Sequence, residues 1–172
     1  MMSQPLAERL RPKTLDDYIG QKHLVGQGAV LRKMIDAGRV PSFILWGPPG
    51  VGKTTLAQII ANKLDAPFYT LSAISSGVKD VREVIEKAKS NRFFNTVSPI
   101  LFIDEIHRFS KSQQDSLLNA VETGVVTLIG ATTENPSFEV IRPLLSRCQV
   151  YVLKSLDKND LLTLLHLSLI HI

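Results

Sequence analysis

The stretch 44–64, "ILWGPPGVGKTTLAQIIANKL", decides the fold of this chain. It begins with apolar residues typical of a buried strand, passes through three glycines and two prolines, and continues with helical periodicity. Gly47 to Thr54 fit the pattern G-x-x-x-x-G-K-[ST], which joins a strand to the first turn of a helix. Such a turn brings backbone N–H groups close to phosphate oxygens, and the helix N-terminus adds unpaired donors and a favourable dipole. The stretch therefore predicts a phosphate-binding loop.

The residues of this loop have separate predicted roles. We expect Lys53 to reach the β- and γ-phosphates of a nucleoside triphosphate and the Thr54 hydroxyl to ligate Mg²⁺. A glycine-rich turn with a solvated lysine is the alternative, but it leaves the alignment of strand, loop and helix unexplained. The other loop residues that we expect to contact the nucleotide are Gly47, Pro48, Pro49, Gly50, Val51, Gly52 and Thr55.

A second group of residues, in "PILFIDEIHRF" (99–109), indicates hydrolysis. The apolar strand 100–103 delivers Asp104 and Glu105 to the same sheet edge as the loop. We expect Asp104 to hold Mg²⁺, directly or through water, and Glu105 to act as general base toward water. If these acids merely capped the next helix, only one carboxylate would be explained. We interpret His107 as a hydrogen-bonding residue beside the site, because no second histidine lies at metal-ligand spacing.

Two further segments carry candidate catalytic residues. The strand "VTLIGATTENP" (126–136) ends in Thr132 and Thr133, whose hydroxyls either orient the attacking water or satisfy backbone groups at the strand end. "PLLSRC" (143–148) places Arg147 at the end of a short helix, where it either complements the helix dipole or neutralises charge on a transferring phosphoryl group.

Short apolar runs alternate with helical patterns along the chain. We expect strands at 43–46, 68–72, 100–104, 126–133 and 150–153, and helices at 53–64, 79–90, 111–121 and 138–146. This order predicts an α/β fold of the P-loop NTPase kind, with a five-stranded parallel sheet and helices on both faces. Ligands of such sheets bind at the carboxyl ends of the strands.

Composition narrows the class of protein. A chain of 172 residues with 44% hydrophobic content supports one core, and a net charge of +4 suits a nucleic-acid partner without requiring one. The single cysteine excludes an intrachain disulfide and indicates a reducing compartment. The longest apolar run, "LLTLLHLSLIHI" (161–172), is shorter than the roughly 20 residues that cross a bilayer. We expect a cytoplasmic protein with no membrane contact, and a leucine-rich final segment that covers or meets something else.

Taken together, the P-loop, "FIDEIHRF", "GATTENPS" and "LLSRC" at these separations resemble the AAA+ ATPases of the clamp-loader branch. The resemblance is strongest to the RarA/MgsA group of replication-associated recombination proteins, whose eukaryotic relative is the Werner-helicase-interacting ATPase. It covers about residues 5–162, and "HRF" with "KSQQD" followed by "GATTENPSFE" is its most specific part. The resemblance implies that Lys53 and Thr54 are the Walker A ligands and Asp104 and Glu105 the Walker B pair. It also makes Thr133 the sensor 1 residue and Arg147 an arginine finger that acts on a neighbouring subunit.

The same resemblance gives the segment "RLRPKTLDDYIGQ" (9–21) a role at the nucleotide. It implies that Arg11, Pro12, Tyr18 and Ile19 line an adenine pocket; packing of an N-terminal arm on the core is the alternative. Ser72 matches a polar residue that restrains the Walker B glutamate in relatives. We divide the chain into an N-terminal arm (1–24), the AAA+ core (25–155) and the start of a truncated helical lid (156–172). Because relatives continue into a full lid and a C-terminal oligomerisation domain, we expect an N-terminal fragment with weak hydrolysis of its own.

The function implied by the resemblance is ATP binding and hydrolysis, with Mg²⁺, at stalled or gapped replication forks in recombination and repair. The implied partners are fork, gap or end structures of DNA, single-stranded-DNA-binding protein, replisome factors and further copies of the full-length chain, in a nucleoid-associated setting. A nucleotide-gated scaffold with negligible turnover and a clamp-loader ATPase subunit are the alternatives. The helix expected near 79–92 is either a solvated face or a phosphate track, since it carries basic side chains among acids: Lys79, Arg82, Lys87, Lys89 and Arg92.

Overall fold

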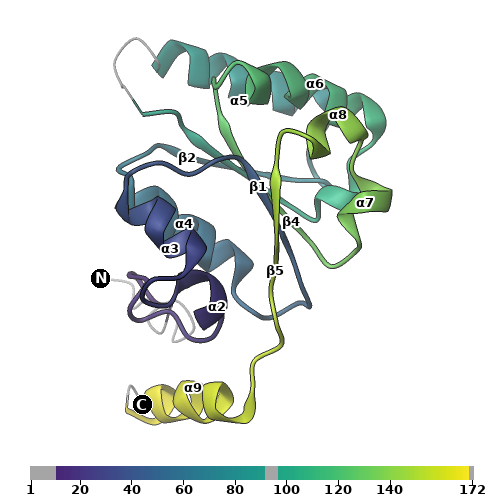
Figure 1. Ribbon diagram of the computed structural model, residues 1–172. Coiled ribbons are helices and arrows are strands. Elements are labelled where there is room, and N and C mark those ends of the chain that lie inside the picture. The colour runs from purple at the N-terminus through teal and green to yellow at the C-terminus, as the bar shows by residue number, and fades with distance from the viewer. Residues whose placement is uncertain (1–10, 92–96, 171–172) are drawn as a thin grey trace, which may run out of the picture.

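The computed structural model describes residues 11–91 and 97–170, and its centre is a parallel sheet (Figure 1). The five strands lie in the order β2-β3-β4-β1-β5, which confirms the predicted fold class. β1 pairs with β4 on one side and β5 on the other, so the strand that leads into the loop lies inside the sheet. The strand bounds are β1 Phe43–Trp46, β2 Phe68–Ser72, β3 Ile100–Asp104, β4 Thr127–Thr132 and β5 Gln149–Val152.

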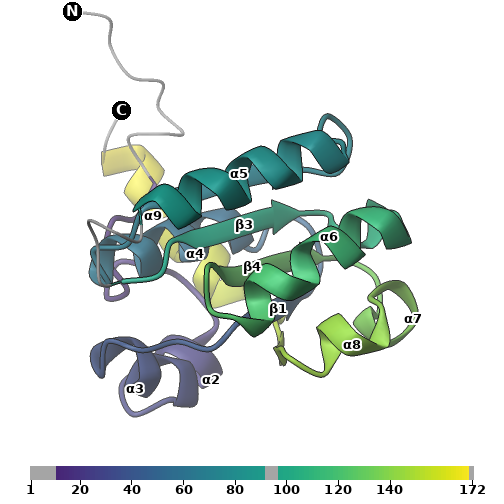
Figure 2. The ribbon, with the colours of Figure 1, turned by 90° about the horizontal axis from the view of Figure 1, so that it is seen from above.

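Helices cover both faces of the sheet, as Figures 1 and 2 show. Alternate strand residues face opposite layers, because successive side chains of a strand point to opposite faces. In β1, Phe43 and Leu45 pack in one buried cluster, whereas Ile44 packs in the other. The first layer holds α2 (Lys22–Val25), α3 (Val30–Asp36) and α4 (Lys53–Lys63); the second holds α5 (Val78–Asn91), α6 (Lys111–Glu122) and α8 (Arg142–Leu145).

The start of α6 is fixed by a capping box. The Ser110 hydroxyl accepts a hydrogen bond from the Gln113 N–H (3.2 Å), and Gln113 Oε1 accepts one from the Ser110 N–H (2.7 Å). This cap lies just after the short 3₁₀ helix η1 (Ile106–Arg108), which follows Glu105. The cap therefore anchors the far end of the segment that carries the acidic pair.

The prediction of one short helix at 138–146 is wrong. The structure has two four-residue helices there, α7 (Pro136–Glu139) and α8 (Arg142–Leu145), separated by Val140 in an extended conformation. Pro143 explains the break, because it has no backbone N–H and its ring would clash with the Glu139 carbonyl in a continuous helix. The helices α2 and α3 were also not predicted; they have four and seven residues, too few for a clear periodic signal.

The last helix, α9 (Lys158–Ile170), lies at one end of the molecule beyond β5 (Figure 1). Two reciprocal hydrogen bonds cap its start: Asp157 Oδ1 accepts from the Asp160 N–H (2.7 Å), and Asp160 Oδ2 accepts from the Asp157 N–H (3.1 Å). None of its residues is buried, and several leucines are exposed on it. Of the described helices, none has the length and apolarity needed to cross a membrane.

Candidate functional site

A cavity of about 430 Å³ opens where β1, β3 and β4 end at their carboxyl termini. Residues from the glycine-rich loop, from the acidic strand and from the end of β4 meet there, although up to 84 positions, from Pro49 to Thr133, separate them in the sequence. The cavity therefore gathers the predicted phosphate, metal and catalytic groups into one space. Its lining residues are Arg11, Pro49, Gly50, Gly52, Lys53, Thr54, Thr55, Asp104, Glu105, Thr132 and Thr133.

Lys53 is held by the loop that precedes it. Its ammonium group donates hydrogen bonds to the carbonyls of Gly47 (2.7 Å) and Pro48 (3.1 Å). Gly47 and Pro48 are thus partners of the lysine rather than cavity-lining residues. Burial lowers the pKa of Lys53, and the nearby negative charge of Asp104 opposes that shift. An anion entering the cavity would favour the charged amine in the same way.

Only glycine fits well at position 52, where the loop turns into α4. Gly52 has a φ of 89°, in the left-handed region that glycine adopts at little cost. A Cβ atom there would also lie 3.0 Å from Tyr18 Oη. Glycine at this position therefore permits both the turn and the close approach of Tyr18. After the turn, α4 begins at Lys53 with its N-terminus toward the cavity.

The two carboxylates differ in backbone setting. Asp104 is the last residue of β3 and is exposed, whereas Glu105 has a φ of 53° and begins the turn into η1. A non-glycine residue in this region is uncommon and costs about 1–3 kcal/mol, and such residues cluster at functional sites. Glu105 Oε2 lies 3.5 Å from Arg108 Nε in an exposed ion pair. The Ser72 hydroxyl, which the resemblance relates to Glu105, accepts a hydrogen bond from the Ile74 N–H (3.4 Å) and so stabilises the turn that follows β2.

Thr132 and Thr133 have different surroundings. Thr132 is only 2% exposed; its Oγ1 lies 2.9 Å from His107 Nδ1 and accepts a hydrogen bond from the Glu134 N–H (2.9 Å). The expectation that His107 hydrogen-bonds beside the site is therefore confirmed. Thr133 lies just past the end of β4, is exposed, and lines the cavity. Of the two threonines that line the cavity, Thr133 is thus the exposed one and Thr132 the buried one.

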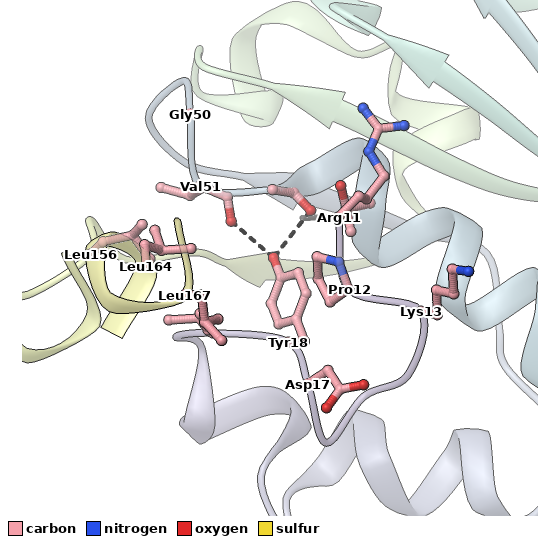
Figure 3. Close-up of a pocket in the computed structure, with 13 residues that line it drawn as sticks. Arg11, Pro12, Lys13, Asp17, Tyr18, Gly50, Val51, Leu156, Leu164 and Leu167 are labelled. Carbon is pink, nitrogen blue, oxygen red and sulfur yellow. Dashed lines mark hydrogen bonds between the residues drawn. The ribbon is translucent and has the colours of Figure 1, made fainter. Parts of the chain in front are cut away.

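A second cavity of about 440 Å³ adjoins the first, because Arg11, Gly50, Gly52 and Thr55 line both (Figure 3). Tyr18 points from the N-terminal arm toward the loop, and its hydroxyl donates to the carbonyls of Val51 (2.9 Å) and Gly52 (3.1 Å). The residues that line this second cavity are Arg11, Pro12, Lys13, Asp17, Tyr18, Ile19, Gly50, Val51, Gly52, Thr55, Leu156, Leu164 and Leu167.

All four residues expected in an adenine pocket lie at this second cavity. Burial raises the pKa of the Tyr18 phenol, which keeps the hydroxyl protonated as a donor to the loop. Lys13 and Asp17 also line this cavity and were not predicted, although both fall inside the arm segment 9–21. The leucines of the final segment were not predicted either, because they lie more than 130 positions from Tyr18 along the chain and no local signal links them to it.

Arg147 lies outside both cavities. It follows α8, its side chain is 55% exposed, and its Nη2 lies 3.7 Å from Glu122 Oε1 on α6. Exposed pairs of this kind contribute about 0–1 kcal/mol and leave the side chain free to change partner. The structure therefore does not bring Arg147 to the cavity of its own chain.

Comparison with known proteins places these features in a wider group. Residues 43–156 match the family described as "ATPase family associated with various cellular activities (AAA)". The chain is 55% identical over 157 residues to a Haemophilus influenzae protein and 56% identical over 158 residues to an Escherichia coli protein, both named Replication-associated recombination protein A. These alignments cover 91% and 92% of this chain but only 35% of each relative. The chain thus spans about a third of the length of these two relatives.

A eukaryotic protein and a solved structure also match the chain. The ATPase WRNIP1 of Dictyostelium discoideum is 53% identical over 165 residues, covering 96% of this chain and 19% of that protein. Among solved structures, the Thermotoga maritima RuvB Holliday junction branch migration motor matches with a TM-score of 0.75 at 31% identity. That match covers 95% of this chain and 55% of the motor.

Proposed function

Since the chain belongs to the AAA family of ATPases, we propose that it binds ATP with Mg²⁺ and hydrolyses the ATP to ADP and phosphate. The observation that carries the proposal is the cavity that joins Lys53 and Thr54 of the loop to Asp104 and Glu105 of β3. Each of these side chains has a charge or hydroxyl that phosphoryl transfer uses, and all four line one space.

Binding of the triphosphate depends first on the loop. The Lys53 ammonium exchanges the carbonyls of Gly47 and Pro48 for β- and γ-phosphate oxygens, which are stronger partners because they are charged. The N-terminus of α4 adds unpaired N–H donors toward the same oxygens. Thr54 and Asp104 supply the hydroxyl and carboxylate oxygens that hold Mg²⁺, which neutralises phosphate charge. The adjoining cavity receives the adenine base between the arm and the leucines of the last segment.

Hydrolysis requires an activated water. Glu105 takes the proton from the water while the water oxygen bonds to the γ-phosphorus and the bond to the β,γ-bridging oxygen breaks. Thr133 orients that water from the cavity rim. Arg147 acts on the γ-phosphate of a neighbouring copy, a role supported by its exposure and by its place outside the lining of its own chain's cavity.

The wider role that we propose is in replication-associated recombination, acting on DNA at stalled or gapped forks as part of a homo-oligomer. The names and identities of the bacterial relatives support it, as does the structural likeness to a branch migration motor. The role concerns a longer protein, because the chain spans 35% of those relatives. On α5, exposed basic side chains suit phosphate contacts whose strength falls as salt rises; they are Lys79, Arg82, Lys87 and Lys89. Arg92 lies outside the described residues.

One observation favours a second candidate, a nucleotide-gated scaffold with negligible turnover. The ion pair between Glu105 and Arg108 holds the proposed base in a contact that competes with water activation. The pair is exposed and 3.5 Å long, so its contribution is small and hydrolysis remains the better-supported function.

The test is single-turnover hydrolysis combined with a binding assay. Glu105→Gln removes the base but keeps the size and polarity of the side chain, so ATP binding should persist while hydrolysis falls at least about 100-fold. Glu83→Gln, an exposed position on α5, is the matched control and should behave as wild type. Hydrolysis that is unchanged in Glu105→Gln would refute the assignment, and wild-type turnover no faster than the uncatalysed reaction would favour the scaffold.

A further inference from the structure

Gln21 is a buried side chain that none of the roles above explains. It is 5% exposed and has a φ of 56°, in the left-handed region. Its Nε2 donates to the Lys154 carbonyl (2.7 Å), and its Oε1 accepts from the Lys154 N–H (2.9 Å). One side-chain amide therefore satisfies both main-chain groups of a residue 133 positions away, as a neighbouring strand would.

The amide joins two segments, the part of the N-terminal arm that precedes α2 (residues 11–21) and the linker from β5 to α9 (residues 153–157). Their close approach is visible at Gly20, where a Cβ atom would lie 2.8 Å from the Leu156 side chain and φ is 85°. In α2, His23 Nε2 donates to the Val152 carbonyl (2.8 Å). Gln21 supplies the buried, two-bonded part of this junction, whereas His23 is exposed.

These two segments are also the two walls of the second cavity. The arm contributes Pro12 and Tyr18, while the linker and α9 contribute Leu156 and Leu164 (Figure 3). The arm wall is fastened to the loop through Tyr18, whose hydroxyl donates to the Val51 and Gly52 carbonyls. The linker wall starts from a different anchor: the Leu153 N–H donates to the Trp46 carbonyl (2.7 Å) at the end of β1. Beyond Leu153, the side-chain hydrogen bonds that join the linker to the arm among the described residues are those of Gln21, so the position of residues 154–157 relative to the arm depends on this junction.

We propose that Gln21 is a positioning residue for the base of the nucleotide: it clamps the linker and α9 to the arm, so that the two walls meet the base together. The inference rests on the proposed nucleotide site but concerns only the base and not the phosphates. The phosphate cavity is lined by the loop and by residues at the ends of β3 and β4, together with Arg11 of the arm, and Gln21 makes no hydrogen bond to any of these among the described residues. Loss of the clamp separates the walls and leaves the phosphate cavity intact.

Two ligands separate the two cavities, namely ADP with Mg²⁺ and inorganic tripolyphosphate with Mg²⁺, each titrated calorimetrically into the 172-residue chain. Tripolyphosphate has no base, so its binding depends on the phosphate cavity and not on the second cavity. Gln21→Glu keeps the size of the side chain but removes the donor and sets a carboxylate against the Lys154 carbonyl. We expect it to weaken ADP binding about tenfold, because a buried hydrogen bond is lost and an acceptor is left unpaired, and to change tripolyphosphate affinity less than about twofold.

A second variant and a control test whether the effect comes from the two hydrogen bonds of the Gln21 amide. Gln21→Asn keeps an amide and tolerates the left-handed backbone, but it is one methylene too short to bridge both groups of Lys154, so it should show the same selective loss. Gln27→Glu makes the same chemical change at an exposed position of the same region and should match wild type. Hydrogen exchange of the Lys154 amide should be faster in both Gln21 variants than in the control, without nucleotide.

The outcomes are distinct. Selective loss of ADP affinity together with faster exchange at Lys154 supports the role of Gln21. In a Gln21 variant that retains a cooperative thermal transition, two results would overturn the role of Gln21: an equal loss of affinity for ADP and tripolyphosphate, or no change in either affinity. Neither result would contradict the proposed nucleotide site. If the wild-type chain binds neither ADP nor tripolyphosphate, the proposed function fails, and the role of Gln21 at the base falls with it.

Discussion

His107 Nδ1 lies 2.9 Å from Thr132 Oγ1, which ties the turn after Glu105 to the end of β4. The same Thr132 hydroxyl accepts a hydrogen bond from the Glu134 N–H (2.9 Å) and donates to the Glu134 carbonyl (3.2 Å), so it joins the imidazole to the segment that follows β4. Glu105 precedes His107 by two positions, and Thr133 follows Thr132 by one. The contact therefore joins the two segments that carry the proposed base and the proposed water-orienting residue.

Replacing Thr132 by Val tests this link. The change keeps the shape of the buried side chain but removes the hydroxyl, so we expect kcat to fall about tenfold and the dissociation constant for ATP to change less. Single-turnover hydrolysis and calorimetric titration measure the two quantities. Thr127→Val, earlier in the same strand, is the control. An unchanged kcat in Thr132→Val would show that the link does not position either group.

The pH dependence of ATP binding should report the state of Lys53. Burial lowers the pKa of this lysine in the folded chain, so the free site loses its positive charge at a lower pH than an exposed lysine would. Phosphate oxygens favour the charged amine, so binding takes up protons and affinity declines as pH rises through the pKa of Lys53. Titrations in buffers of different ionisation enthalpy, from neutral pH upward, measure this uptake.

Lys53→Arg is the control for that experiment, because a guanidinium stays charged throughout the range. Its proton uptake should vanish, whatever its affinity. The same shift carries a stability consequence: below the lowered pKa the buried ammonium costs folding free energy, and this cost is relieved as pH rises toward the ordinary pKa of lysine. Proton uptake that persists undiminished in Lys53→Arg would assign the effect to another group.

Removing the Tyr18 hydroxyl should loosen both the loop and the arm. Tyr18→Phe deprives the Val51 and Gly52 carbonyls of their donor, so we expect the free energy of unfolding to drop by about 1–3 kcal/mol and ADP affinity to weaken about tenfold. Urea unfolding and calorimetry measure these effects. Tyr151→Phe is the matched control, since that hydroxyl reaches only the Met34 sulfur at 3.7 Å. Equal effects of the two substitutions would deny Tyr18 a special role.

A mixing experiment tests whether Arg147 acts between chains. Arg147→Ala should reduce hydrolysis about 1,000-fold at concentrations where the protein associates, without weakening ATP binding. Its ion pair with Glu122 is exposed, so stability should change little. Mixing Arg147→Ala with Glu105→Gln should restore activity, because some interfaces then combine an intact base with an intact arginine. Arg142→Ala, on α8, serves as control; no recovery on mixing would contradict action in trans.

Local sequence was sufficient for the elements that carry the phosphate cavity. The loop was predicted because glycines and a helix start fall at fixed spacing, and the acidic pair because it directly follows a run of apolar strand residues. The same reasoning failed at 138–146, where Pro143 divides one expected helix into α7 and α8. It also missed α2 and α3, whose apolar residues are buried by contacts with α4 and the sheet rather than by their own periodicity.

The sequence by itself determined where the glycine-rich loop and the acidic pair lie, and hence which residues we propose for phosphate, metal and water, because these features depend on residues a few positions apart. Only the tertiary structure decided which residues complete the second cavity, since that cavity is lined by an arm and a final helix far apart along the chain. The junction of Gln21 with Lys154 is likewise visible only in the tertiary structure. A side chain that bonds a distant backbone leaves no periodic or motif signal, because its partner is chosen by the path of the folded chain.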